Sequence, residues 1–152
     1  MSSKHRYACS ALLVAAIILS LVSLAQVEAA VITEWTLPTA SSAPLSIFVD
    51  SGLVYFAELA GNNIGRLDPA TGVFTEWTIP TGGAGPFGIF VDGGFVYFPE
   101  NSASKIGRLD ASTGVFTEWT IPTAVSGPEN AFVSTGLVYF AENAGNKVGR
   151  LD

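Results

Sequence analysis

A period of 42 residues runs through this chain. The dipeptide Glu-Trp, a tyrosine and an arginine all recur at that spacing, as Glu34-Trp35, Glu76-Trp77 and Glu118-Trp119, as Tyr55, Tyr97 and Tyr139, and as Arg66, Arg108 and Arg150. A fixed period of this length, with aromatic and glycine positions held, indicates a repeat architecture. One blade of a β-propeller takes about 40 to 50 residues. The period therefore predicts propeller blades.

Each repeat contains four short apolar runs separated by turn-forming residues. In the middle repeat these runs span residues 88–92, 95–100, 105–110 and 115–121. The pair Gly93-Gly94, between the first two runs, is typical of a tight hairpin because glycine accepts positive φ. The first two runs are almost wholly apolar, as in strands buried on both faces, whereas the fourth alternates. We therefore expect an all-β fold of four-stranded antiparallel blades.

The predicted domain spans residues 30–152 and holds about three blades. The repeats lie near residues 47–79, 89–121 and 131–152, and an isolated outer strand is expected at 31–37. Three blades are too few for a closed ring, because propellers have about four to eight. Two copies would make six blades, which predicts a homodimer that completes the ring. The other interpretation, slightly favoured because nothing after Asp152 completes the last repeat, is a partial propeller cut from a longer one.

The first 29 residues predict a secretory signal peptide. Lys4, His5 and Arg6 form a positive start, residues 8–25 carry no charge, and residues 27–29 form an acceptable cleavage site. This predicts a secreted, extracytoplasmic protein. The alternative is an uncleaved anchor, since the apolar run is just long enough to span a bilayer. Contact with a membrane is expected only in that case.

Composition excludes several kinds of active site. The only cysteine is Cys9 and the only histidine is His5, and both precede the repeats. The repeats therefore contain no thiol nucleophile, imidazole base or histidine metal ligand, which excludes Ser-His-Asp and Cys-His catalysis and the usual zinc sites. The net charge is −6, without basic clusters. We expect no nucleic-acid partner.

Four motifs of the middle repeat resemble the virginiamycin B lyase (streptogramin lyase) family, and the resemblance covers roughly residues 31–152. They are Gly85-Pro86-Phe87-Gly88-Ile89, Val96-Tyr97-Phe98-Pro99-Glu100, Lys105-Ile106-Gly107-Arg108-Leu109-Asp110 and Thr113-Gly114-Val115-Phe116-Thr117-Glu118-Trp119. The resemblance implies a seven-bladed propeller that opens a cyclic peptide antibiotic at an ester by elimination. It also implies a histidine base and a magnesium ion held by glutamates.

The position of the family's histidine is occupied here by Leu45, Phe87 or Glu129. We therefore expect a secreted binding or scaffold module without lyase activity. The first alternative is a lyase-like, metal-dependent enzyme that cleaves a carbon–oxygen bond with carboxylates alone. The second is a fragment of a longer propeller without independent function.

The glutamates that the resemblance assigns to metal binding are Glu58, Glu100 and Glu142. They could hold Mg²⁺ or Ca²⁺, which prefer oxygen ligands. The favoured alternative is a structural contact between repeats, with Arg66, Arg108 and Arg150 as partners. No other cofactor is expected.

Ligand binding is predicted at the loops before the first strands. Glu129 and Asn130 break the repeat there, and Phe87 is the third candidate. The ligand class stays open between a small molecule, a peptide and a glycan. The repeated tryptophans could be platforms for sugar rings, but we favour packing between blades.

Overall fold

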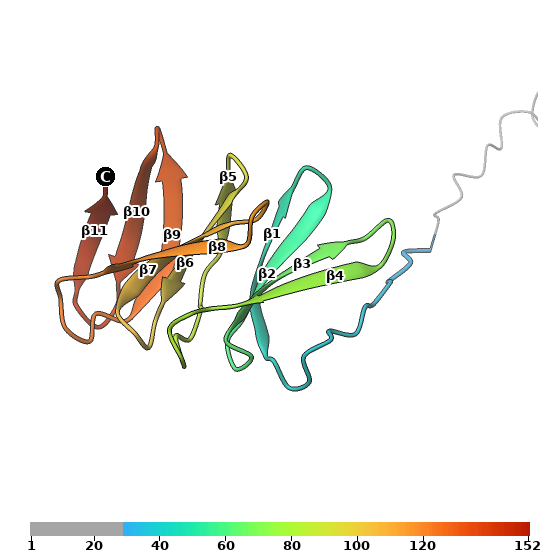
Figure 1. Ribbon diagram of the computed structural model, residues 1–152, viewed down its shortest axis with the longest axis horizontal. Coiled ribbons are helices and arrows are strands. Elements are labelled where there is room, and N and C mark those ends of the chain that lie inside the picture. The colour runs from blue at the N-terminus through green and yellow to red at the C-terminus, as the bar shows by residue number, and fades with distance from the viewer. Residues whose placement is uncertain (1–28) are drawn as a thin grey trace, which may run out of the picture. The chain divides into compact units, whose positions relative to one another are not determined.

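The structure is a row of three antiparallel β-sheets, each of which is one blade (Figure 1). The computed structural model describes residues 29–152, and Trp35–Asp152 form one unit. Blade 1 contains β1 (Pro44–Asp50), β2 (Leu53–Glu58), β3 (Asn63–Asp68) and β4 (Val73–Thr78). Blade 2 contains β5 (Phe90–Asp92), β6 (Phe95–Glu100), β7 (Lys105–Asp110) and β8 (Val115–Thr120). Blade 3 contains β9 (Pro128–Ser134), β10 (Leu137–Glu142) and β11 (Lys147–Leu151).

The first strands of neighbouring blades lie together. β1 contacts β5, and β5 contacts β9, whereas β4 and β8 are the last strands of their sheets. This arrangement confirms the predicted propeller, in which blades radiate from a common axis. Blades 1 and 2 have the predicted four strands, and blade 3 has three. In the part of the chain that the structure describes, no helix has the length and apolarity that a membrane span requires.

A two-residue turn joins the first and second strands of every blade, as the glycine pattern predicts. Both central residues of each turn have positive φ, which suits the twist of a β-hairpin. The φ values are 50° and 80° for Ser51-Gly52, 57° and 83° for Gly93-Gly94, and 52° and 80° for Thr135-Gly136. Thr135 is a β-branched residue in a region that favours glycine, so its turn is strained.

The blades pack face to face through the same repeat positions. The rear face of a blade, which contacts the next blade, presents Tyr55, Ala57 and Ile64 in blade 1. The front face, which contacts the preceding blade, presents Ile89, Val91, Val96, Phe98 and Leu109 in blade 2. At the next junction, Ile106 and Tyr97 pack against Ala131, Val138 and Phe140. Both junctions are apolar cores, and each is built from two neighbouring repeats.

Residues 31–37 form no strand, which corrects the predicted outer strand. An outer strand needs the third strand of its own blade as its hydrogen-bonding neighbour. β3 cannot serve, because it already pairs with β2 and β4. Residues 31–37 therefore carry the sequence pattern of an outer strand, but no third strand with a free edge lies beside them.

The segment Trp35–Thr39 nevertheless lies on blade 1 much as the end of blade 1 lies on blade 2. The hydroxyl of Thr39 donates to Glu76 Oε2 at 2.7 Å, and that of Thr81 donates to Glu118 Oε2 at 2.8 Å. A Cβ atom on Gly72 would lie 3.8 Å from Trp35 Nε1, and one on Gly114 would lie 3.3 Å from Trp77 Nε1. The segment therefore occupies the place of an outer strand in front of blade 1.

The predicted signal peptide over residues 1–29 falls outside the described residues, apart from Ala29. Cleavage and export stay predictions.

Candidate functional site

Three glutamates end the second strands of the blades, and all three are buried. Glu58 and Glu100 have no exposed surface, and Glu142 is 6% exposed. Asn63 donates a hydrogen bond of 2.8 Å to Glu58 Oε2. Among the described residues, Glu58 Oε1, Glu142 Oε2 and both carboxylate oxygens of Glu100 have no hydrogen-bond partner. A buried polar group without a partner is costly, so these positions are unusual for a purely structural residue.

The environment of Glu100 favours its neutral form. Burial, together with the charge of Glu118, raises the pKa of Glu100 to about 7, although the charge of Lys105 opposes the shift. Burial also raises the pKa of Glu58, although the Asn63 hydrogen bond opposes the shift. Burial disfavours a charge because the interior solvates it poorly. Each of these blades therefore holds a carboxyl group that gains a proton more readily than in water.

A second carboxylate beside Glu100 is fully paired. Lys105 Nζ lies 3.0 Å from Glu118 Oε2 and 2.7 Å from the hydroxyl oxygen of Thr81. Burial opposes a low pKa at Glu118, but hydrogen bonds from Lys105 and Thr81 outweigh it and lower the pKa. This network links the loop after blade 1 to blade 2.

The expected arginine partners do not contact these glutamates. Arg66 lies over the ring of Trp77 at 5.3 Å and Arg108 over that of Trp119 at 5.4 Å, while Arg150 pairs with Asp152. The hypothesis of ion pairs from the three arginines to Glu58, Glu100 and Glu142 is therefore wrong, and the neighbours are Asn63, Lys105 and Glu118. The register explains this, because Glu58 faces Asn63 and Glu100 faces Lys105 across their strand pairs.

A resident Mg²⁺ or Ca²⁺ does not fit the arrangement of these residues. Unpartnered carboxylate oxygens suit a hard cation, which takes about six or more oxygen ligands. Among the described residues, however, no group of three or more acidic, histidine or cysteine side chains comes close enough to hold a metal ion. Glu58, Glu100 and Glu142 are thus not gathered into one site, and we derive no metal-dependent step.

The predicted ligand residues lie at the blade 2–blade 3 junction. Phe87 precedes β5 as expected, whereas Glu129 and Asn130 lie within β9 and not in the loop before it, because β9 begins at Pro128. A Cβ atom on Gly88 would lie 2.6 Å from the carbonyl oxygen of Glu129 and 3.3 Å from Asn130 Oδ1. Glu129 accepts a hydrogen bond from Asn143, and Asn130 is exposed. Phe87 is half-buried, and its amide donates to the carbonyl of Pro99 at 3.2 Å. Of the three, Glu129, which is half-buried, and Asn130, which is exposed, present polar side chains near the start of β9.

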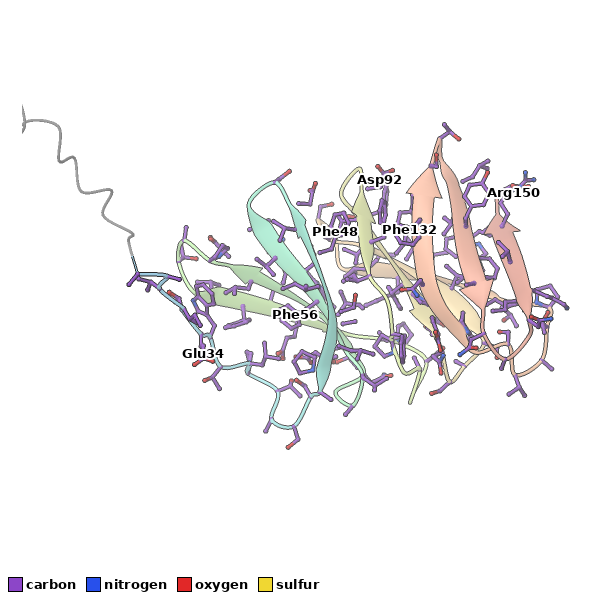
Figure 2. All side chains as sticks on the ribbon, turned by 180° about the vertical axis from the view of Figure 1, so that it is seen from behind. Glu34, Phe48, Phe56, Asp92, Phe132 and Arg150 are labelled. Atoms are coloured by element: carbon purple, nitrogen blue, oxygen red, sulfur yellow. The ribbon has the colours of Figure 1, made fainter. Side chains whose placement is uncertain are left out.

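An aromatic row on the inner strands is the feature that the sequence reasoning missed. The ring centroids of Phe48 and Phe90 are 4.9 Å apart, and those of Phe90 and Phe132 are 5.6 Å apart. These residues come from β1, β5 and β9, and Figure 2 shows the outer two of them. Their 42-residue spacing in the predicted first strands could have revealed the row. It gives the inner side of the blades an apolar, aromatic surface.

The tryptophans of the outer strands pack as structural residues. Trp77 and Trp119 are half-buried beneath their arginines. Trp77 also borders the core between blades 1 and 2. This supports the packing interpretation over a platform for sugars.

Comparison with known proteins identifies the repeat. The model of the virginiamycin B lyase family matches residues 22–152. A streptogramin B lyase structure is 33% identical with a TM-score of 0.74, and the match covers 78% of this chain and 40% of that one. A selenomethionine-substituted virginiamycin B lyase from Staphylococcus aureus is 37% identical with a TM-score of 0.74, with 80% and 42% covered. Comparison with curated protein sequences gives no match.

A third similar structure is that of a lyase variant in which a histidine has been replaced. It is a catalytically inactive virginiamycin B lyase from Staphylococcus aureus, with one histidine changed to alanine, solved with quinupristin. It is 30% identical to this chain with a TM-score of 0.56, and the match covers 80% of this chain and 56% of that one. The chain spans about two fifths of the length of the first two lyases. By its repeat, its blades and these matches, the chain belongs to the virginiamycin B lyase family.

Proposed function

We propose that this chain is an exported propeller module that binds a ligand without lyase catalysis. The observation that carries the proposal is the absence of histidine from residues 29–152, where Leu45, Phe87 and Glu129 stand at the sequence positions that the resemblance assigns to the family's base. Elimination needs a group that removes a proton, and imidazole is the most common base near neutral pH. The inactive lyase variant solved with quinupristin supports the separation of ligand binding from catalysis in this family.

The proposed ligand contacts the inner side of the blades. The rings of Phe48, Phe90 and Phe132 offer an apolar surface, and Glu129 and Asn130 add polar groups near the start of β9. Binding sites commonly combine an apolar lining with a few polar groups that fix orientation. A small molecule or peptide with aromatic or aliphatic groups suits this surface better than a glycan.

The test uses quinupristin as the probe. Calorimetry should detect binding, and liquid chromatography should recover the peptide with its ring intact after prolonged incubation. Phe90→Ala should weaken binding about tenfold, because stacking area is lost. Val115→Ala is the control, since Val115 is 61% exposed on the outer strand β8. Opened quinupristin would overturn the non-catalytic proposal, and absence of binding would overturn this ligand class.

A metal-dependent lyase is the alternative to this proposal, although no group of three or more acidic side chains comes together among the described residues. It predicts that Mg²⁺ binds with heat detectable by calorimetry and that quinupristin is opened only when Mg²⁺ is added. The variant with Glu100→Gln and Glu142→Gln should lose both. If the unmodified chain binds no Mg²⁺, this candidate is wrong.

Export is tested by the N-terminus of the purified protein. Expression from Met1 in a secreting bacterial host should yield extracytoplasmic protein that begins at Ala30, if cleavage follows Ala29. Mass spectrometry distinguishes this form from an uncleaved chain in the membrane fraction, which would support the anchor instead.

A further inference from the structure

We propose that a second copy of this chain closes the propeller. In this arrangement, blade 3 of each copy packs on blade 1 of the other, and residues 31–37 of each copy form the fourth strand of the other copy's blade 3. Two copies give six blades, within the usual range of about four to eight. The inference goes beyond the proposed function and does not depend on it.

The front face of blade 1 is an interface without a covering blade. Ile47 is 68% exposed and Val49 is 62% exposed, whereas Ile89 and Val91, at the same repeat positions of blade 2, are 8% and 5% exposed. A pocket of about 360 Å³ lies on this face. Its lining includes the front-face positions Ile47, Val54, Phe56, Leu67 and Phe74. Exposed apolar surface of this kind marks an interaction site.

The rear face of blade 3 is the matching surface. Tyr139 is 39% exposed and Val148 is 81% exposed, whereas the equivalent Tyr55 and Ile64 of blade 1 are 5% and 0% exposed. In blade 1 these positions form the core with blade 2. Blade 3 thus carries the apolar residues that every other junction uses, on a face that no described residue covers. The rear face of blade 3 and the front face of blade 1 are complementary, because they carry the residue positions that form the two sides of the junctions between blades 1 and 2 and between blades 2 and 3.

Among residues 29–152, no carboxylate pairs with the lysine of β11, whereas the equivalent lysine of β7 has such a partner. In blade 2, Lys105 binds Glu118 of β8 and the hydroxyl of Thr81. In blade 3, Lys147 keeps only the equivalent hydroxyl, that of Thr123 at 2.8 Å. The 42-residue period assigns the role of Glu118 to Glu34, which is exposed. Residues 31–37 of a second copy would supply this carboxylate to Lys147.

The arginine of β11 points to the same partner segment. Arg66 and Arg108 each lie over the tryptophan of the adjacent outer strand. In the described part of the chain, Arg150 lies over no such ring and pairs instead with Asp152, with 2.6 Å between Arg150 Nε and Asp152 Oδ1. The period assigns the role of that tryptophan to Trp35, which is 41% exposed. Lys147 and Arg150 of β11 therefore lack the contacts that the adjacent residues Glu34 and Trp35 of a second copy would provide.

One placement of the second copy is consistent with all these contacts. The segment Trp35–Thr39 already lies where an outer strand in front of blade 1 would lie. A blade placed on the front face of blade 1 brings its third strand to that segment. Among the described residues, β11 cannot be that third strand, because blade 1 and β11 stand at opposite ends of the row (Figure 1). A second copy carries both the complementary face and the complementary strand edge, so it is the occupant that we propose.

The first test is the solution mass of the full chain, expressed from Met1 and purified after any natural processing. Light scattering should give twice the mass of the chain found by mass spectrometry. A folded monomer, a trimer or a heterogeneous aggregate would each overturn the two-copy ring. Circular dichroism on the same sample establishes that the protein is folded.

Charge exchange tests the strand contact. Glu34→Lys alone and Lys147→Glu alone should each raise the dissociation constant of the dimer about tenfold, because like charges then face each other. The double variant should restore the original value. Asp92→Lys, on an exposed hairpin, is the control and should leave the constant unchanged. If the double variant is no better than the single ones, the register is wrong.

A disulfide gives a second readout. By the register of Arg108 with Thr117 in blade 2, Arg150 faces Thr33 of the second copy. Facing residues of antiparallel strands are about 4.5–5.5 Å apart, within disulfide range. With Cys9→Ser, the pair Thr33→Cys and Arg150→Cys should form a covalent dimer on oxidation. The pair Thr33→Cys and Ser112→Cys should not. A monomer from the first pair would contradict the proposed contact.

Discussion

The ring of Phe98 on β6 covers Gly107 on β7, its direct partner across the strand pair. The same relationship joins Phe56 to Gly65 and Phe140 to Gly149. A Cβ atom on any of these glycines would overlap the ring. Glycine is required here by the approach of an aromatic side chain, and its φ is not in the left-handed region.

Gly107→Ala should destabilise the protein by about 1–3 kcal/mol, because the fully buried Phe98 ring cannot move away freely. Denaturant unfolding followed by tryptophan fluorescence measures the change. Gly82→Ala is the matched control, since a Cβ atom there meets nothing within 4 Å. Equal stability of the two variants would show that the core yields to the extra methyl group.

Glu100→Gln should stabilise the protein at pH 8 by on the order of 1–3 kcal/mol and change little at pH 4. Burial raises the pKa of Glu100 in the folded state to about 7, above its ordinary value of 4.5. Between these values the folded state binds more protons than the unfolded state, so this group's contribution to stability falls as the pH rises from about 4.5 to about 7. Unfolding measured across this range should show the fall in the unmodified protein and a flatter profile in Glu100→Gln.

The pKa of Asp110 is shifted in the opposite direction to that of Glu100, so Asp110 serves as a comparison. Hydrogen bonds from the Ser112 side chain and amide lower the pKa of Asp110 to about 2. Its contribution is therefore present above the ordinary value of 3.8 and is lost as the pH falls toward about 2. Asp110→Asn should reduce stability at pH 7 and should not alter the profile between pH 5 and 8. A changed profile there would mean that Glu100 is not the group responsible.

Thr135→Gly should stabilise blade 3 by about 0.5–1 kcal/mol. Its φ of 52° is strained for a β-branched residue, and the equivalent position in blade 2 is Gly93. The greater freedom of glycine in the unfolded state offsets part of the gain. Thermal unfolding measures the change, and Gly93→Thr is the reverse variant, expected to destabilise. If both variants destabilise, the turns are not interchangeable.

Thr81→Val should destabilise the blade 1–blade 2 junction by about 1–2 kcal/mol, because Glu118 loses a charge-assisted hydrogen bond of 2.8 Å from the Thr81 hydroxyl. Thr71→Val is the control, since the hydroxyl of Thr71 serves only an exposed turn. Denaturant unfolding compares the two. A loss no greater than that of Thr71→Val would show that water replaces the hydroxyl.

Much of the fold follows from local sequence, and the exceptions have physical causes. The period and the glycine pairs predict the blades and hairpins because each repeat contains its own strand partners. Residues 31–37 form no strand in the structure, because an outer strand needs a pairing neighbour that no periodicity within the segment specifies. The side-chain neighbours of Glu100 were likewise hidden, since they depend on the register that places Lys105 opposite it.

The buried junctions between blades have a consequence for how such a protein changes in length. Tyr55 and Ile64 on one blade, and Tyr97 and Ile106 on the next, meet equivalent residues of the blade that follows. Insertion or loss of 42 residues at the loop between blades therefore leaves every remaining junction chemically the same. Blade number in such a chain can therefore change by one 42-residue segment at a time without creating a new kind of junction.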